Sequence, residues 1–457
     1  MDLKKKAKAQ YRNISEELSP LTVSAFILST GLMLYQHSLG WSWDFGVYSM
    51  IGHYIFHDGF YMEWLRPPVA SVIMGLMQFI VPRRIAEYLF IVFSSTVFLY
   101  STKRVSEAYE IDFESFYIFM LTPAAILYST VAGTEMLSLA FAMLFLADLD
   151  SPKTGIWLGL AFLTRYNYGL LIPLTFLQKD LAKTVKTGII SGLTLIPWLL
   201  YNYVTTGNPL TSFGNFLMLN VFLRHIDTPL GLENFLLISL PSAVILLSYI
   251  KPEVREKISL NKINLFMLGF TGLTAFSYFT ADLRTLRYLY PLVLPVGFYA
   301  SKAWEEIGLR EILTALLALN IIFGGISIAK HGMADPHRYK KAAGVLDQCM
   351  AESEDWTHLN YAGVPTRPVS SKEITMERLK KGYRSVSFKD TGYRNLSAPV
   401  IADTETFTIY GYEDRCAEQV KADSTYLDGF NERTDLNYTF SGYIYERVIQ
   451  DKLKVLK

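Results

Sequence analysis

Two adjoining stretches decide the fold, namely residues 21–40, LTVSAFILSTGLMLYQHSLG, and residues 41–71, WSWDFGVYSMIGHYIFHDGFYMEWLRPPVAS. The first has the apolar character and length of a helix that crosses a bilayer, which takes about 20 residues. The second is rich in aromatic residues and also contains Asp44, Asp58, Glu63 and Arg66. A loop that only joined two membrane helices could be shorter and less charged. We therefore interpret residues 41–71 as a site at a membrane face.

The rest of the chain also has the composition of a membrane protein. Of its 457 residues, 51% are hydrophobic, and the mean hydropathy is +0.22. The apolar residues gather in blocks that predict about 11 transmembrane helices. Lipid offers no partner to an open sheet edge, so the expected class is an all-α polytopic membrane protein. A net charge of +1 gives no indication of a nucleic-acid partner. After the first span, the blocks begin near Pro68, Ile85, Ser115, Glu135, Gly155, Gly188, Phe235, Ile263, Tyr290 and Glu311.

The basic residues predict the orientation. The cluster from Lys4 to Arg12 places the N-terminus in the cytoplasm, so that residues 41–71 lie outside. Strict alternation would then put Arg83 and Arg84 inside but Lys103 and Arg104 outside. Alternatively, residues 68–80 lie along the interface and residues 155–177 form a broken, double-dipping segment, which moves Lys103 and Arg104 inside. The sequence leaves both arrangements open.

After about Lys330 the composition becomes polar, which divides the chain into a transmembrane domain (1–330) and a soluble domain (331–457). Residues 372–381 have a helical pattern. Residues 385–388 and 400–410 are rich in β-branched and aromatic residues and predict strands. We expect a small extracytoplasmic α/β or α+β domain.

Two further features of this domain depend on its compartment. Cys349 and Cys416 could form a disulfide in an oxidising compartment, and two unrelated thiols are the alternative. The triplets Asn395-Leu-Ser and Asn437-Tyr-Thr are glycosylation sequons that can be used only outside the cytoplasm.

Asp44 is the first candidate for chemistry. Asp44 and Tyr48 are four residues apart and would share one face of a helix that runs to about His57. The alternative is that Asp44 is only the N-cap of an interfacial helix, a position that favours Asp.

Arg66 is the second candidate, because Pro67 and Pro68 stiffen the backbone that follows it. A guanidinium group at a membrane face can bind a phosphate through paired hydrogen bonds. The alternative is an arginine that extends toward lipid headgroups.

Three more ionisable residues lie beside apolar blocks. Glu135 opens such a block, where a charged group is costly and therefore a functional candidate. A carboxylate stabilised at a helix N-terminus is the other interpretation. Arg165 and Arg287 also border apolar blocks, and for each of them extension toward headgroups is the simpler reading.

Metal and nucleotide chemistry have weaker support. His53 and His57 are four residues apart and His57 is next to Asp58, a spacing that can bind a metal from one helix face. An interfacial histidine pair without a metal is the alternative. The sequence has no GxxxxGK[ST] phosphate loop, no GxGxxG in a strand–helix setting and no GxSxG elbow, so a phosphate substrate would be bound without a nucleotide-binding domain.

These motifs together resemble a known family. An early Asp44, a Tyr48 four residues later and a closing Arg66-Pro-Pro after the first span are similar to the GT-C class of polyprenyl-phosphate-sugar glycosyltransferases. Within that class the resemblance is to the protein O-mannosyltransferase and aminoarabinose-transferase branch. Residues 133–135 (GTE), 159–166 (GLAFLTRY) and 287–291 (RYLYP) resemble further motifs of the family.

One departure from the family concerns a second carboxylate. Many relatives have Asp-Glu where this chain has Asp44-Phe45. A second acid would have to come from Glu63 or Glu135, or is not needed, which leaves a divalent metal possible as the cofactor.

The resemblance implies a reaction. The donor would be a sugar on a dolichyl or undecaprenyl phosphate, and the acceptor a hydroxyl of a protein, lipid or glycan, with inversion at the sugar. Asp44 would be the base, with Glu135 as a second catalytic acid. The phosphate would be bound by Arg66, Arg287 and Arg165, and the substrates would be contacted by Tyr48, Tyr54, Glu63, Trp64 and Tyr288. A transporter or flippase of a lipid-linked or small polar substrate is the alternative, although no paired repeat supports it.

Overall fold

The computed structural model describes residues 18–178, 180–219, 226–227, 237–241, 261–280, 283–305, 310–346, 349–390 and 396–421. Several predictions fall outside these ranges and stay predictions. They concern the basic N-terminal cluster, most of the span expected from Phe235, and the sequons at Asn395 and Asn437.

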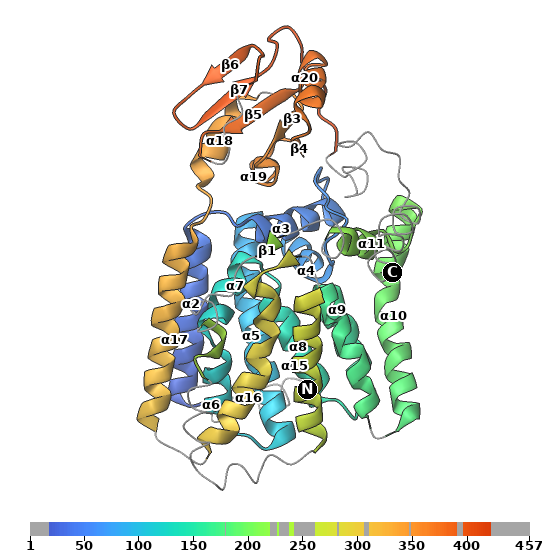
Figure 1. The fold of residues 1–457 in the computed structure, drawn as a ribbon, viewed down its shortest axis with the longest axis vertical. Coiled ribbons are helices and arrows are strands. Elements are labelled where there is room, and N and C mark those ends of the chain that lie inside the picture. The colour runs from blue at the N-terminus through green and yellow to red at the C-terminus, as the bar shows by residue number, and fades with distance from the viewer. Residues whose placement is uncertain are drawn as a thin grey trace, which may run out of the picture.

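The molecule is a helical body with a small sheet domain, the cap, at one end (Figure 1). Figure 1 also shows α3 and α4 lying across the end of the body that faces the cap, and α2 beside α17. The helices of the body are α2 (Pro20–Ser38), α3 (Trp43–Phe56), α4 (Val69–Met77), α5 (Arg83–Tyr109), α6 (Phe113–Met120), α7 (Pro123–Val131), α8 (Glu135–Ala147), α9 (Thr154–Thr164), η1 (Tyr166–Leu177), α10 (Leu181–Thr206), α11 (Thr211–Leu217), α15 (Lys262–Thr280), η3 (Leu286–Leu292), α16 (Val293–Trp304) and α17 (Arg310–His331). Two short strands, β1 (Ile226–Asp227) and β2 (Leu283–Arg284), pair in parallel.

Two of the expected apolar blocks, those from Ser115 and from Gly155, are each divided between two helices. Within the described ranges, α5 and α17 are long and apolar enough to cross a membrane, and a third span results if the bent pair α7–α8 is taken as one. That pair bends by 117° at Gly133, whose φ is +78°. The segment α9–η1 breaks at Arg165, and η1 and η3 each contain a proline. The number of about 11 spans therefore stays a prediction.

Two of the helices show apolar faces that suit lipid. Along α10 the exposed residues recur every three or four positions, which makes one continuous stripe on the helix. Leu193 and Val204, for example, are 58% and 80% exposed. On α17, Ile322 is 57% exposed in the same way. Exposed apolar stripes of this length are expected where helices contact lipid chains.

Two sets of contacts bear on the arrangement of residues 68–177, whose membrane topology stays a prediction. Arg83 donates to the Tyr361 carbonyl oxygen in the cap at 2.6 Å, whereas Arg104 pairs with Asp148 at 3.1 Å at the opposite end of α5. The chain also returns after Arg165, because Gln178 donates to the Leu149 carbonyl oxygen at 2.8 Å. The segment therefore enters and leaves at one end, as the double-dipping alternative requires. Which end faces the cytoplasm stays a prediction.

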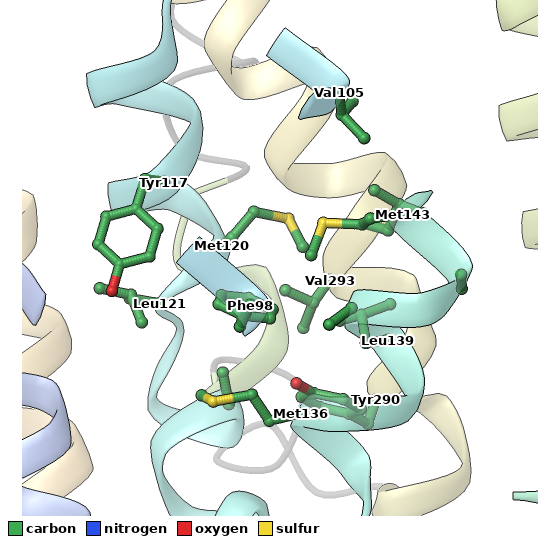
Figure 2. Close-up of a cluster of buried hydrophobic side chains, with 14 of the residues drawn as sticks. Phe98, Val105, Tyr117, Met120, Leu121, Met136, Leu139, Met143, Tyr290 and Val293 are labelled. Atoms are coloured by element: carbon green, nitrogen blue, oxygen red, sulfur yellow. The ribbon is translucent and has the colours of Figure 1, made fainter. Parts of the chain in front are cut away.

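Buried hydrophobic side chains from several helices of the body form one core (Figure 2). Phe98 of α5, Met136 of α8 and Tyr290 of η3 are among its buried side chains, each 2% exposed or less. Met136 follows Glu135 directly, and Tyr290 lies one helical turn after Arg287. This core thus holds the two elements that bear these charged residues.

The cap is the small α/β domain that the sequence predicts. Its sheet has the order β4–β3–β5–β7–β6, in which β3 is parallel to β4 and β5, while β7 is antiparallel to β5 and β6. Cys349 and Cys416 form a disulfide. The strands and helix expected from residues 372–410 are confirmed, while the elements before them were not expected. The elements of the cap are α18 (Pro336–Val345), β3 (Ala351–Ser353), α19 (Trp356–Tyr361), β4 (Thr366–Pro368), α20 (Lys372–Lys380), β5 (Arg384–Phe388), β6 (Val400–Asp403) and β7 (Phe407–Tyr410).

Candidate active site

Helix α3 places Asp44 at the end of the body that faces the cap. The helix begins at Trp43, its N-cap is Ser42, and Asp44 lies in its first turn. The expected helix is therefore present, but Asp44 is not its N-cap. At the other end of the helix, Gly52 lets the backbone of α4 approach closely, since a Cβ there would collide with the backbone of Ser71 and Gly75.

Both oxygens of Asp44 accept from arginines. Arg66 Nη2 lies 2.7 Å from Oδ1, and Arg287 Nη1 is bonded to Oδ2. Burial acts to raise the pKa of Asp44, but the charges of Arg66 and Arg287 outweigh burial and hold its pKa well below the usual value. Asp44 is therefore ionised throughout the neutral range.

Glu135 is the second carboxylate and is almost fully buried, with 1% of its side chain exposed. Its Oε1 accepts from both Arg165 and Arg287. Its Oε2 accepts from the backbone amide and the hydroxyl of Thr134, each at 3.2 Å. Each of the two oxygens thus accepts two hydrogen bonds, which fills the acceptor sites of the carboxylate. Glu135 therefore anchors the two arginines and has no free site for a proton.

Glu63 provides the third carboxylate. Its Oε2 lies 2.9 Å from Arg66 Nε, and its Oε1 accepts from the hydroxyl of Tyr61. Burial and the Glu63 carboxylate raise the pKa of Tyr61 well above its usual value, so the phenol keeps its proton.

The ion pairs join six residues into one chain of alternating charge, which we call the charge chain. Its order is Glu63, Arg66, Asp44, Arg287, Glu135 and Arg165. Three carboxylates face three guanidinium groups, so the charges sum to zero. Residues 44, 63, 66, 135, 165 and 287 come from five separate parts of the chain that all meet at the end of α3.

A cavity of about 630 Å³ opens beside the charge chain, between the body and the cap. Asp44, Arg66 and Arg287 line it, whereas Glu135 and Arg165 do not. The middle of the charge chain is thus accessible to a ligand, and its Glu135–Arg165 end is packed behind. The other lining residues are Trp41, Ser42, Trp43, Val131, Thr285, Tyr288, His331, Gly332, Met333, Ala334, Trp356 and His358.

Of the remaining residues predicted to bind substrate, Tyr288 lines the cavity, whereas Tyr48, Tyr54 and Trp64 do not. Tyr288 lines the cavity, and Arg165 lies 5.8 Å from its ring centre. Tyr48 lies below Arg66, which stands 5.6 Å from the ring centre. Tyr54 contacts Lys421, and Trp64 packs near Tyr201, so neither of these aromatic residues is part of the cavity wall.

The histidine pair has a structural role. Nδ1 of His53 lies 3.1 Å from the side-chain oxygen of Gln78, and Nε2 of His57 lies 3.1 Å from the Gly75 carbonyl oxygen. These contacts join α3 to α4. Asp58 is exposed, and in the described part of the chain no cluster of three metal-ligating side chains occurs.

The charge chain itself suits a metal poorly. Both oxygens of Asp44 and both of Glu135 already accept hydrogen bonds, and guanidinium groups surround the two carboxylates. A divalent cation there would have to displace an arginine and remain beside its positive charge. The residues of the charge chain therefore do not fit a metal ion.

Sequence reasoning missed the part of the cavity wall contributed by the cap. Trp356 and His358 come from α19, about 300 residues after α3, and no spacing pattern marks them. Trp41 and Trp43 lie within the stretch that the sequence singled out, but the prediction chose Tyr54 and Trp64 from that stretch instead.

The chain has the GT-C fold that the sequence motifs predict. Two solved structures with this fold are those of ArnT from Cupriavidus metallidurans, one bound to undecaprenyl phosphate and one in the apo state. The TM-scores are 0.62 and 0.57, with 13% sequence identity over 85% of this chain and 97% of ArnT in both cases. No family model matches the sequence, and no curated protein matches it.

Proposed function

We propose that this chain is a membrane glycosyltransferase that moves a sugar from a polyprenyl phosphate to an acceptor hydroxyl, with inversion at the anomeric carbon. The observation that carries the proposal is Asp44, held between Arg66 and Arg287 on the wall of one cavity. Such a transfer needs a base for the hydroxyl and donors for the leaving phosphate. The fold shared with ArnT bound to undecaprenyl phosphate supports this donor class.

The charge chain suggests how the reaction begins. Asp44 pairs with both arginines, so the donor phosphate has to compete with Asp44 for them. A phosphate that accepts from Arg66 and Arg287 loosens their hold on Asp44 and raises its affinity for a proton. Donor binding would in this way prepare the base.

The transfer step follows from this arrangement. The acceptor oxygen attacks the anomeric carbon while the bond from that carbon to the phosphate oxygen breaks. The proton of the hydroxyl passes to Asp44, and the electron pair of the broken bond stays on the lipid phosphate. Arg66 and Arg287 stabilise the charge that develops there. Glu135 acts as a positioning residue, since it holds Arg287 from behind.

The proposal includes the placement of the protein. The transmembrane domain, residues 1–330, would hold the lipid tail, and residues 331–457 would lie outside the cytoplasm with the cavity. The disulfide Cys349–Cys416 supports an oxidising compartment for the cap.

We propose that transfer is independent of metal, so that EDTA leaves the rate of transfer in a membrane preparation unchanged. A loss of activity that Mg²⁺ or Mn²⁺ restores would contradict this.

A variant at Asp44 tests the function. Membranes containing the wild type and Asp44→Asn are assayed with undecaprenyl and dolichyl phosphates that carry different sugars. The matched control is Asp58→Asn, an exposed acid in the same stretch. We expect transfer by the wild type and the control, and a loss of about a hundredfold or more for Asp44→Asn. Normal transfer by Asp44→Asn would remove the base assignment.

The transfer assay, combined with a measurement of lipid movement between leaflets, also addresses the transporter alternative. If the wild type transfers no sugar from any donor but moves a lipid-linked sugar between leaflets, the chain is a flippase and the enzyme proposal fails.

A further inference from the structure

The cap and helix α3 together contribute an aromatic wall to the cavity, and this wall has no role in the reaction described so far. Resting on the proposed function, we propose that Trp43, Trp356 and His358 form the subsite that binds the sugar ring of the lipid-linked donor. These three residues are called the aromatic wall. All three line the cavity together with Asp44 and Arg287.

The aromatic wall is ordered by edge-to-face contacts. The rings of Trp43 and Trp356 lie 4.7 Å apart at 89°, and those of Trp43 and His358 lie 5.3 Å apart, also at 89°. Behind them, Tyr339 stacks on His358 at 4.7 Å. Such contacts hold aromatic rings in fixed orientations. The wall is therefore held in place by the packing of the protein's own side chains.

His358 is a buried polar group that lacks a partner. Only 7% of the residue is exposed, and among the described residues neither ring nitrogen has a hydrogen-bond partner. The Asp355 carboxylate lies 3.8 Å from Nδ1, beyond hydrogen-bond distance. A buried polar atom without a partner is costly, so a hydroxyl of a bound ligand would be stabilised here.

Trp356 is linked to the charge chain. Its indole N–H donates to the hydroxyl of Tyr61 at 3.2 Å, and that hydroxyl in turn donates to Glu63. Glu63 is paired with Arg66 at 2.9 Å. The residue proposed to bind phosphate and the residue proposed to bind sugar are thus connected through two side chains.

The chemistry of the wall favours a sugar ring. A pyranose presents apolar C–H faces, which pack on aromatic rings, and hydroxyls at its edge, which need polar partners. Small-molecule sites typically combine apolar and aromatic side chains with precisely placed polar groups. We assign the wall to the donor sugar for two reasons. In the donor, the sugar is bonded directly to the phosphate, and Arg66 and Arg287, which would bind that phosphate, line the same cavity as the wall. Trp43 also directly precedes Asp44 in the sequence.

Binding titrations on the purified full-length protein in lipid nanodiscs test the subsite. The probes are undecaprenyl phosphate without a sugar and the same lipid carrying mannose, glucose or aminoarabinose. We expect the wild type to bind at least one sugar-bearing lipid about tenfold more tightly than the bare lipid. Trp356→Ala and His358→Ala should abolish this preference. His358 forms no hydrogen bond or ion pair with the charge chain, so His358→Ala should also leave the affinity for the bare lipid unchanged, which shows that this variant is folded.

Two further variants sharpen the test. Trp356→Phe keeps a ring and should retain part of the preference. Met333→Ala removes a non-aromatic residue from the same cavity and should retain all of it.

Each outcome separates this inference from the function. A wild type that binds neither kind of lipid would contradict the proposed function itself. A wild type that binds every lipid equally, or alanine variants that keep the preference, would overturn the sugar subsite alone. Variants that bind both lipids normally but transfer no sugar would assign the wall to the acceptor and overturn the donor assignment.

Discussion

Asp44 has the lowered pKa that two neighbouring arginines impose, and this predicts how stability depends on pH. A carboxylate whose pKa is lower in the folded state stabilises the protein above its unfolded pKa of about 3.9, and this stabilisation is lost as the pH falls through the folded pKa. Between pH 5 and 8 the difference in Tm between the wild type and Asp44→Asn should therefore stay constant. Thermal unfolding in detergent measures it. A difference that shrinks steadily from pH 8 to pH 5 would show that Asp44 titrates in the neutral range.

Arg287 is the residue that joins Asp44 to Glu135. Arg287→Ala removes a donor to the leaving phosphate and should lower kcat/KM by about 100- to 1000-fold. Arg287→Lys keeps the charge, but a single ammonium group cannot bridge two carboxylates as a guanidinium does, so it should recover only part of the activity. Arg104→Ala, at the far end of α5, is the control. Full activity of Arg287→Ala would exclude Arg287 from phosphate binding.

At the scale of elements, the bend between α7 and α8 brings Glu135 to the site. Gly133 has a φ of +78°, and a Cβ there would meet the ring of Phe45, the neighbour of Asp44, at 2.7 Å. Gly133→Ala should destabilise the fold by about 1–3 kcal/mol and reduce transfer. Gly192 lies inside α10 with open space around it, so Gly192→Ala is a matched control that should be neutral or slightly stabilising. Equal Tm values for the two variants would contradict the strain at Gly133.

The same scale shows what sequence reasoning could reach. Ionisable residues beside apolar blocks are costly, and this rule singled out Glu135, Arg165 and Arg287. Asp44 was found from its spacing to Tyr48 and Arg66 from the two prolines after it, while Glu63 was named through the family resemblance. The sequence could not tell their pairing, because ion pairs between distant segments have no local pattern. The break after Gly133 agrees with the separate block predicted from Glu135, and the break at Arg165 agrees with the alternative of a broken segment over residues 155–177. The angle of each bend could not be predicted, because it depends on packing against distant helices. Trp356 and His358 lie on a helix of 6 residues, which is too short for its hydrophobic periodicity to predict it.

At the scale of the whole molecule, a second buried polar cluster joins the cap to the body. Glu87 of α5 accepts from Tyr361 of α19, from Arg84 at 3.0 Å, and is 2.9 Å from Nε2 of His37. Glu87→Ala leaves these groups buried without their acceptor and should destabilise the protein by about 3–5 kcal/mol, seen as a lower Tm.

The control for Glu87 is an acid in an exposed pair on the same helix. The Glu107 side chain is 50% exposed and pairs with Arg104 at 3.5 Å. Glu107→Ala should change the free energy of unfolding by less than about 1 kcal/mol. If both variants unfold at the same temperature, the Glu87 cluster does not hold the cap in place.

The balance of the charge chain also bears on which anions can enter the site. Since three acids already satisfy three bases, a dissolved ion such as inorganic phosphate meets no surplus of positive potential and has to dislodge Asp44 unaided. A donor anchored by its hydrocarbon chain is confined to the membrane beside the opening, which raises its effective concentration there. The protein would thus bind soluble phosphates weakly and bind phosphates that are attached to a lipid.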